Sequence, residues 1–358
     1  MGSGLSGALL RAWTGKGPLA CALLPVAALY GALAAVRRPL FRWHLLKSQR
    51  VNAFVIVVGN VVAGGAGKTP TVISLVRHLQ ARGLRVGVVS RGFGRDGQAC
   101  QPVSASSSAQ DVGDEPLLIA RATDAPVFVA RDRHQAASAL LAQHPQTDVI
   151  VCDDGLQHDR LFRDLDICVF DDRGCGNGWL LPAGPLREPW PRRGVAAAGQ
   201  SADRLLVLNT SGKGAGVGGG GQFTALRALA TVAQDRHGAT TPLLDLNAPG
   251  RLPVQAVAGI ARPEMFFNML RQTGLVLAHT QALPDHFDFR QANIASWGAV
   301  QLLCTEKDAP KLWQVAPSAL SVALEQTIEP AFFEAVDQQI AAHRAAQAAS
   351  RLSSGHGH

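Results

Sequence analysis

The 358-residue sequence has little of several residue types on which particular functions depend. Aromatic residues make up 6% of it and no run of Lys and Arg is longer than two, which disfavours a surface that stacks and neutralises nucleic acid. The six cysteines form no C-x-x-C and no other metal-ligand spacing. Cys152 and Cys168 lie inside apolar segments, so we expect buried free thiols in a reducing compartment.

Charged residues are also scarce, at 17%, whereas apolar residues reach 47% and are concentrated near the N-terminus. The net charge of +7 nevertheless favours an anionic partner, such as a nucleotide, a phosphorylated substrate or a phospholipid surface. The length allows a sizeable core and two domains. No internal repeat is present.

The most informative segment is FVIVVGNVVAGGAGKTP, residues 54–70. It predicts an apolar strand, a glycine-rich turn and a helix that begins at Lys68. The glycines let backbone N–H groups converge on an anion, while a lysine and a hydroxyl suit the phosphates and Mg²⁺ of a nucleotide. A proline fits the first helical turn, where its missing N–H costs nothing. The predicted nucleotide-binding residues are Gly64, Gly65, Ala66, Gly67, Lys68, Thr69 and Pro70.

The spacing departs from the usual phosphate-binding loop (P-loop) pattern, because Val62 stands where its first glycine belongs. The register G-G-x-G-K-T is typical of deviant P-loops, although Ala63 replaces the lysine that usually precedes their glycine pair. No N-K-x-D is found for guanine recognition, neither in TEKD at 305–308 nor after the predicted strand that ends at Leu208. ATP is therefore the expected nucleotide.

Residues 18–36 form a stretch of 19 positions without a charge. A cleaved signal peptide, a buried core helix and a membrane-associated helix are the competing interpretations. A signal peptide would carry a nucleotide-binding domain away from ATP, so we favour a helix that anchors in the membrane or lies in its interface. Basic residues flank the stretch and are denser after it, which places the following domain on the cytoplasmic side. They are Arg11 and Lys16 before the stretch and Arg37, Arg38, Arg42, Lys47 and Arg50 after it.

Short apolar strands alternate with helices along the chain and predict an α/β fold with a P-loop NTPase-like, doubly wound, mostly parallel sheet. The expected strands of this sheet, beyond the one before the P-loop, are 86–90, 127–129, 148–152, 166–170 and 204–208, with a helix over 132–143. A second, smaller α/β unit is expected from strands at 254–260, 275–278 and 299–304 and helices from Pro263 to about Thr273 and near 329–345.

These segments predict five regions along the chain. A glycine-rich stretch and an Ala/Ser/Gly/His-rich C-terminus are expected to be flexible. The regions are a membrane-associated helix with its basic flank (1–50), a P-loop kinase domain (51–210), a flexible loop (211–221), a smaller α/β domain (222–340) and a disordered tail (341–358).

Two pairs of acidic residues stand where phosphate chemistry would use them. Asp153 and Asp154 follow an apolar strand directly, which suits a Mg²⁺ ligand beside a P-loop, although a polar turn would also explain them. Asp114 and Glu115, in DVGDEP, either cap a helix or orient an attacking hydroxyl as a base. The predicted metal ligands are Thr69, Glu115, Asp153 and Asp154.

The remaining polar candidates are ambiguous from residue type alone. His286, in LPDHFDF, is either a structural turn residue or a catalytic group, and TEKD could simply begin a helix. Arginine forks suit phosphate groups where several surround one cleft, although each alone could equally be a surface residue. The arginines near predicted strand ends are Arg91, Arg95, Arg131, Arg133, Arg160, Arg163 and Arg187.

Taken together, the motifs resemble those of the tetraacyldisaccharide 4'-kinase family of lipid A biosynthesis, in order and spacing from about residue 50 to 325. The most specific are DDGLQH (153–158) and GNGWLLPAGPLREP (176–189). The others are GNVVAGGAGKTP, SRGFGR (90–95), DVGDEP, RDLDICVFD (163–171), GIARPEMFF (259–267), PDHFDF and TEKDAPKL (305–312). One departure is Leu156, where the family has phenylalanine, and an apolar residue is kept.

The resemblance implies ATP-dependent phosphorylation of the 4'-hydroxyl of a lipid A disaccharide 1-phosphate, with Mg²⁺, at the cytoplasmic face of a Gram-negative inner membrane. It implies Asp114 as the catalytic carboxylate, His286 as its partner from the second domain and Lys68 as the P-loop lysine. The substrate-facing positions that it implies are Arg91, Arg133, His158 and Arg187. A monomer without nucleic acid is expected, in which His286 reaches the site when the two domains close.

Two alternatives stay open at this point. A membrane-associated regulatory ATPase would fit the deviant P-loop register, although Ala63 and the motif at 176–189 argue against it. A soluble nucleotide-binding protein whose N-terminal helix belongs to the core is the other.

Overall fold

A computed structural model describes residues 9–42, 48–65, 67–104, 106–191, 204–212 and 217–354. Ala66, part of the glycine-rich loop at 211–221 and the last four residues lie outside this description. The strands are β1 Phe54–Gly59, β2 Val86–Ser90, β3 Gln101–Val103, β4 Val127–Val129, β5 Val149–Asp153, β6 Leu165–Phe170, β7 Leu205–Asn209, β8 Gly221–Gln234, β9 Thr240–Pro242, β10 Val254–Ala258, β11 His279–Ala282, β12 Gln301–Thr305 and β13 Leu320–Ile328.

Helices cover the strands and begin where the sequence supplies starting residues. Pro263 and Pro330 open two of them, and Asp132 caps a third by accepting a hydrogen bond from the His134 N–H. The α-helices are α2 Pro18–Ala22, α3 Leu24–Arg42, α4 Lys68–Ala81, α5 Ala109–Val112, α6 Asp114–Thr123, α7 Arg133–Gln143, α8 Pro263–Gln272, α9 Ala309–Leu312 and α10 Pro330–Ser354, with 3-10 turns η2 Leu243–Asn247, η3 Phe289–Gln291 and η4 Ile294–Trp297.

Within the described residues, all 13 strands join one sheet in the order β11-β10-β12-β13-β8-β7-β6-β1-β5-β2-β4-β3, with β9 beside β8. The first unit, β1 to β7, is parallel except for its edge strand β3. β1 shows why it is central: Phe54, Ile56 and Val58 enter one core and Val55 and Val57 the other. Both faces are buried, which confirms the predicted mixed α/β fold with a mostly parallel sheet.

The second unit contains β10, β11 and β12, which are parallel, together with α8 and α9. Phe266, Phe267 and Leu270 of α8 fill the core on one face of its sheet. Phe289 and Leu312 belong to the core on the other face. One strand was misplaced from the sequence: residues 275–278 do not form it, and β11 begins at His279.

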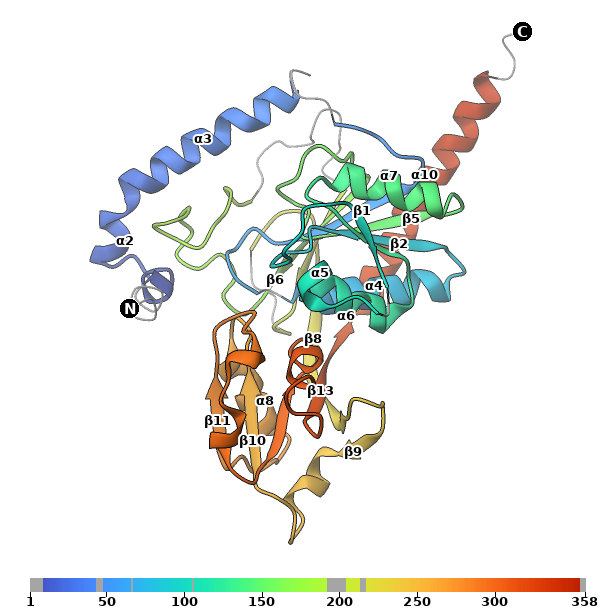
Figure 1. Cartoon of the computed structure of the whole chain (residues 1–358). Coiled ribbons are helices and arrows are strands. Elements are labelled where there is room, and N and C mark those ends of the chain that lie inside the picture. The colour runs from blue at the N-terminus through green and yellow to red at the C-terminus, as the bar shows by residue number, and fades with distance from the viewer. Residues whose placement is uncertain are drawn as a thin grey trace.

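The two units are joined by a connecting ribbon made of β8 and β13 (Figure 1). The first residues of β8, 221–224, pair in parallel with β7, and the remainder of the strand pairs antiparallel with β13. Both ribbon strands were missed from the sequence. β8 begins inside the glycine-rich stretch that was expected to be flexible throughout.

The C-terminal helix α10 packs on the first unit, although the sequence placed its residues with the second. Phe332, Val336 and Ile340 are buried in the same core as β1. His78 of α4 stacks on Phe333 with ring centroids 4.4 Å apart. The helix continues to Ser354, so the expected disordered tail from residue 341 is not observed before that residue.

At the N-terminus, α2 and α3 lie at the outside of the first unit (Figure 1). The uncharged stretch is divided by a turn at Leu23, between the two helices. In the described part of the chain, no helix is long and apolar enough to cross a bilayer. The Tyr30 hydroxyl donates a hydrogen bond to the Arg187 carbonyl at 2.8 Å, and Asn177 donates to the carbonyls of Ala12 and Gly15.

Candidate active site

The glycine-rich turn after β1 forms the expected strand–loop–helix arrangement. Gly67 caps α4 with φ at 83°, a left-handed conformation that favours glycine, and no side chain caps this end of the helix. A Cβ at Gly67 would lie 2.7 Å from Cζ of Arg227 on β8, so a larger residue would also require the Arg227 side chain to move. Uncapped N–H groups at a helix start form an anion site.

The P-loop lysine is already directed to the edge of the sheet. Lys68 Nζ donates to Asn60 Oδ1 at 3.2 Å and lies 3.6 Å from Asp154 Oδ1. Thr69 and Pro70 follow it in the first turn of α4. Ala66, the remaining residue of the predicted loop, lies outside the described residues.

Asp153, the last residue of β5, is a buried carboxylate with little compensation. Its side chain accepts one hydrogen bond, from Ser90 Oγ at 3.2 Å to Oδ2, while Oδ1 is buried without a hydrogen bond. Burial and the negative charges of Glu115 and Asp154 raise the pKa of Asp153 to about 7. An acid in this setting favours a proton or a metal cation.

Asp154 faces the loop cations. Its backbone has φ at 50°, and its Oδ1 lies 3.6 Å from both Lys68 Nζ and Arg187 Nη1. Buried Arg133 donates to the carbonyls of Arg131 and Asp154, so its contacts here are with backbone and not with an open cleft. Of the substrate-facing candidates, Arg187 is therefore next to the P-loop lysine, whereas Arg133 braces the loop beneath.

A second cluster forms where α6 meets the second unit. Asp114, 8% exposed, holds His286 Nδ1 at 2.8 Å and Lys311 Nζ at 2.9 Å, and both contacts use its Oδ2. Burial alone would raise the pKa of Asp114, but the hydrogen bond with His286 and the charges of Lys311 and Lys307 outweigh it, so the pKa lies below its ordinary value. The structure thus brings together the predicted pair from two units.

The segment around His286 is strained and well supported. Its φ of 61° is left-handed, and its backbone N–H donates to the Gly259 carbonyl at 3.0 Å. The ring lies 5.4 Å from that of Phe93, and Lys307 Nζ stands 3.4 Å from His286 Nε2. Lys307 also pairs with Glu115 at 3.8 Å and with Asp285.

The other predicted arginines are dispersed. Arg91 is exposed at the end of β2, and Arg160 pairs with Asp132. Arg163 is buried and donates to the carbonyl of His158, which holds the DDGLQH segment in place. Arg91 and His158 keep their predicted roles as candidates only.

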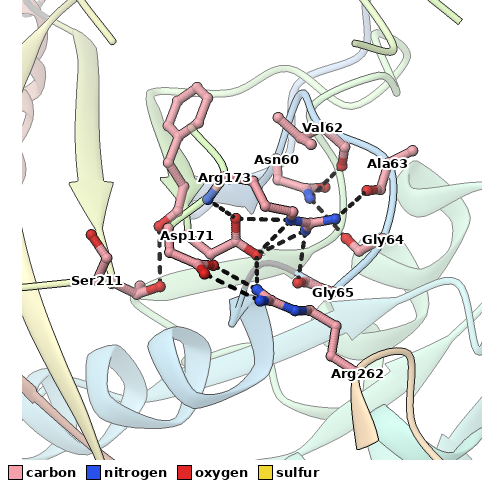
Figure 2. Close-up of polar contacts among 12 residues, drawn as sticks. Asn60, Val62, Ala63, Gly64, Gly65, Asp171, Arg173, Ser211 and Arg262 are labelled. Carbon is pink, nitrogen blue, oxygen red and sulfur yellow. Dashed lines mark hydrogen bonds and ion pairs between the residues drawn. The ribbon is translucent and has the colours of Figure 1, made fainter. Parts of the chain in front are cut away.

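Four cations at this site were not singled out from the sequence. Lys307 and Lys311 stand in TEKDAPKL, where a lysine pair looks like an ordinary helix start. Arg173 and Arg262 contact Asp171 beneath the P-loop (Figure 2). No local pattern distinguishes these four cations from surface residues. The acidic partners of Lys307, Lys311 and Arg262 are distant in sequence, and Arg173, although only two residues from Asp171, reaches P-loop carbonyls about 110 residues away.

A glycine-rich loop that links the buried strand β1 to the helix α4 is the phosphate-binding arrangement of P-loop proteins. With the acidic residues Asp153 and Asp114, this arrangement is typical of a P-loop phosphotransferase. Residues 19–341 match the model of the tetraacyldisaccharide-1-P 4'-kinase family. The chain belongs to this family, and the predicted kinase function is confirmed at that level.

Named relatives agree over nearly the whole chain. The tetraacyldisaccharide 4'-kinase of Acidovorax ebreus is 53% identical over 95% of this chain and 96% of its own. The tetraacyldisaccharide 4'-kinase of Delftia acidovorans is 48% identical over 94% of this chain and 95% of its own. Among solved structures, LpxK from Aquifex aeolicus, crystallised in complex with ATP, has a TM-score of 0.74 and 26% identity, and it covers 90% of this chain and 99% of that one.

Proposed function

We propose that this protein transfers the γ-phosphate of ATP to the 4'-hydroxyl of a tetraacyldisaccharide 1-phosphate, yielding ADP, the 4'-phosphorylated lipid and a proton. The observation that carries the proposal is Asp114, an ionised, nearly buried carboxylate bound by His286 and Lys311 from the second unit. A carboxylate of this kind is suited to a sugar hydroxyl, and a P-loop supplies the phosphate to it.

The chemistry depends on positioning. Phosphoryl transfer has a loose transition state, so the hydroxyl needs orientation more than early deprotonation. The lowered pKa of Asp114 keeps it ionised, and it accepts the hydrogen bond of the attacking hydroxyl and then its proton. In this proposal, His286 and Lys311 fix Oδ2, so that Oδ1 is the oxygen presented to substrate.

Residues of the P-loop hold the nucleotide. The free N–H groups at the start of α4 bind phosphate oxygens, and Lys68 offsets charge on the transferring group. Thr69 supplies a hydroxyl on the same turn. In this arrangement Lys68 exchanges its present contacts with Asn60 and Asp154 for phosphate oxygens.

The residues present fit a Mg²⁺ ion. Asp153 keeps an oxygen without a hydrogen bond, and Asp154 and Glu115 add negative charge around it. The described residues hold no group of three His, Cys, Asp or Glu side chains that could bind a metal. Mg²⁺ commonly takes one or two carboxylates and completes its shell with phosphate and water. When bound, it would offset charge on the β- and γ-phosphates, with Asp153, Asp154, Thr69 and Glu115 as candidate ligands.

The N-terminal helices suit a lipid substrate. Seven large apolar side chains are exposed between residues 10 and 33; they are Leu10, Leu19, Leu24, Val26, Leu29, Tyr30 and Leu33. We infer that α2 and α3 lie in the interface of the inner membrane on its cytoplasmic side. The Tyr30 hydroxyl donates to the Arg187 carbonyl, so the same surface would deliver the acylated sugar beside Arg187. Arg91 and His158 are further candidates for contact with the substrate, and the protein is proposed to act as a monomer.

The test is transfer of labelled γ-phosphate from ATP to tetraacyldisaccharide 1-phosphate in detergent micelles, with Lys68→Ala as the matched control. Label on the lipid, lost in the control, supports the proposal. Label released only as inorganic phosphate by a folded, ATP-binding protein would contradict it and indicate a regulatory ATPase.

A further inference from the structure

The P-loop is held from outside by side chains that bind its carbonyl oxygens. Asn60 Nδ2 donates to the carbonyls of Val62 and Gly64 at 2.6 and 3.1 Å. Arg173 donates to the two that alternate with them, from Nη1 to Ala63 at 3.1 Å and from Nη2 to Gly65 at 3.0 Å (Figure 2). Four consecutive carbonyls, from 62 to 65, are therefore fixed.

Fixing a carbonyl also fixes the N–H of the same peptide. In a trans peptide the C=O of one residue and the N–H of the next point in opposite directions. The Ala63 carbonyl points to Arg173, so the Gly64 N–H must point away from it. A loop whose carbonyls face side-chain donors presents N–H groups on its other side, which is the property that a phosphate requires.

The guanidinium of Arg173 is itself anchored. Its Nε lies 3.0 Å from both oxygens of Asp171, which is 3% exposed, and Nη2 approaches Oδ2 at 2.8 Å. All three nitrogens are thus engaged at once. A lysine could not make this set of contacts, because it carries one compact ammonium group and not a planar fork.

The same aspartate binds the second unit. Arg262, at the N-terminus of α8, places Nη1 at 3.4 Å from Asp171 Oδ2 and forms a bidentate pair with neighbouring Asp172 at 2.5 and 3.1 Å. Figure 2 shows Arg173 and Arg262 both directed at the carboxylate of Asp171, with Arg173 above it and Arg262 below. A continuous chain of contacts therefore runs from α8 through Asp171 and Arg173 to Gly65.

We propose that Arg173 is a positioning residue that holds the P-loop in its phosphate-accepting shape, and that Arg262 couples this shape to the second unit. Arg173 does not touch substrate in this role. It occupies the outside of the loop at Ala63, the position at which the sequence lacks the lysine of other deviant P-loops. Arg262 adds a means by which movement of the second unit changes affinity for the nucleotide.

The test measures ATP binding by calorimetry with no lipid present, so its outcome does not depend on the phosphate acceptor. Arg173→Ala should raise the Kd for ATP by about tenfold or more, because two charged hydrogen bonds to the loop are lost. Arg173→Lys should not restore affinity. Arg271→Ala is the matched control, since Arg271 lies on α8 and its side chain contacts Asn268.

Turnover distinguishes positioning from a general loss of structure. We expect the KM for ATP to rise in Arg173→Ala while the KM for lipid and kcat at saturating ATP stay within about twofold. Thermal melting identifies a variant that fails to fold. A folded Arg173→Ala protein with unchanged ATP affinity would overturn the proposal.

Arg262→Ala keeps the proposal testable if Arg173 variants do not fold, because every contact with the P-loop stays in place. We expect the Kd for ATP to rise by about threefold, with faster amide hydrogen exchange in the P-loop segment. Unchanged affinity and unchanged exchange in this variant would overturn the coupling to the second unit. If wild-type protein binds ATP but labels no lipid, the proposed function fails while this inference still stands.

Discussion

Asp114 and Asp153 are both buried acids, yet their surroundings are opposite. Asp114 is bound by a histidine and a lysine from the second unit, and its pKa is lowered. Asp153 has one hydroxyl partner and acidic neighbours, and burial raises its pKa to about 7. Under the proposed function, the protein itself supplies the partners of the acid that would orient the hydroxyl, whereas Asp153 would take its partner from a cation bound with the nucleotide.

The largest effect should come from removing the negative charge of Asp114, the acid that is bound by a histidine and a lysine. Asp114→Asn keeps the shape but removes the acceptor for the hydroxyl proton, so kcat/KM should fall by about 10³-fold. The Kd for ATP, measured by calorimetry, should stay unchanged. Turnover within tenfold of wild type would show that Asp114 is not the catalytic carboxylate.

The next largest effect on activity should come from Asp153, the buried acid that has only one hydrogen-bond partner. Asp153→Asn should lower kcat by about 10²-fold and weaken the dependence of the rate on Mg²⁺. The same variant should nevertheless be more stable than the wild-type protein at neutral and higher pH. Because folding raises the pKa of Asp153, wild-type stability falls as the pH rises from about 4 through about 7, where the unfolded chain has already lost the proton.

The asparagine variant lacks this titration, so in metal-free buffer its stability advantage should grow over that pH window to the order of 3 kcal/mol. Denaturant unfolding at pH 5 and pH 8 measures it. A variant that is less stable than wild type at pH 8 would contradict the contrast between the two acids.

A smaller effect should follow from weakening the compensation at Asp114. Lys311→Ala should lower kcat by about tenfold and cost about 1–2 kcal/mol at neutral pH, because one charged hydrogen bond to a buried carboxylate is lost. The lowered pKa of Asp114 stabilises the fold above pH 4, and this contribution is lost as the pH falls through the folded-state pKa.

The stability difference between Lys311→Ala and wild type should therefore shrink toward pH 3. Lys311→Arg should recover part of the activity, since it restores the charge. A difference that is constant from pH 3 to pH 8 would mean that Lys311 acts through packing alone.

The smallest effect on activity should come from the glycine-rich stretch at 211–221, which lies outside the sequence motifs of the site. Lys213→Ser should leave turnover within about 1.5-fold of wild type. Gly220→Ala should leave the chemistry intact but cost about 1–3 kcal/mol, because φ is 48° and the added Cβ would lie 2.0 Å from the Leu205 carbonyl oxygen. A Gly220→Ala protein as stable as wild type would contradict the left-handed, crowded position of Gly220.

Local patterns explain which parts of the fold were predictable. β1 and β5 are buried on both faces and read as short continuous apolar segments, and Lys68 begins its helix where the glycines end. β8 was not predictable in this way. Its burial alternates irregularly, and it is stabilised by pairing with β13, almost a hundred residues away.

The site shows the same limit. The position of Asp153 could be predicted because it directly follows an apolar strand. His286 could be assigned only by resemblance, because its partner Asp114 is 172 residues away. Lys311 is separated from Asp114 by 197 residues and has no local signature. Tertiary structure, and not residue type, brings these two residues to Asp114.

The location of α10 has a consequence for synthesis of the chain. Phe332, Val336 and Ile340 complete the core around β1, although they are made after nearly everything else. At typical rates the ribosome needs about ten seconds to proceed from β7 to this helix. During that time an apolar face of the first unit is exposed, so the nascent chain is a candidate chaperone client. Truncation at the C-terminus should therefore lower the yield of folded protein more than it lowers the activity of the protein that does fold.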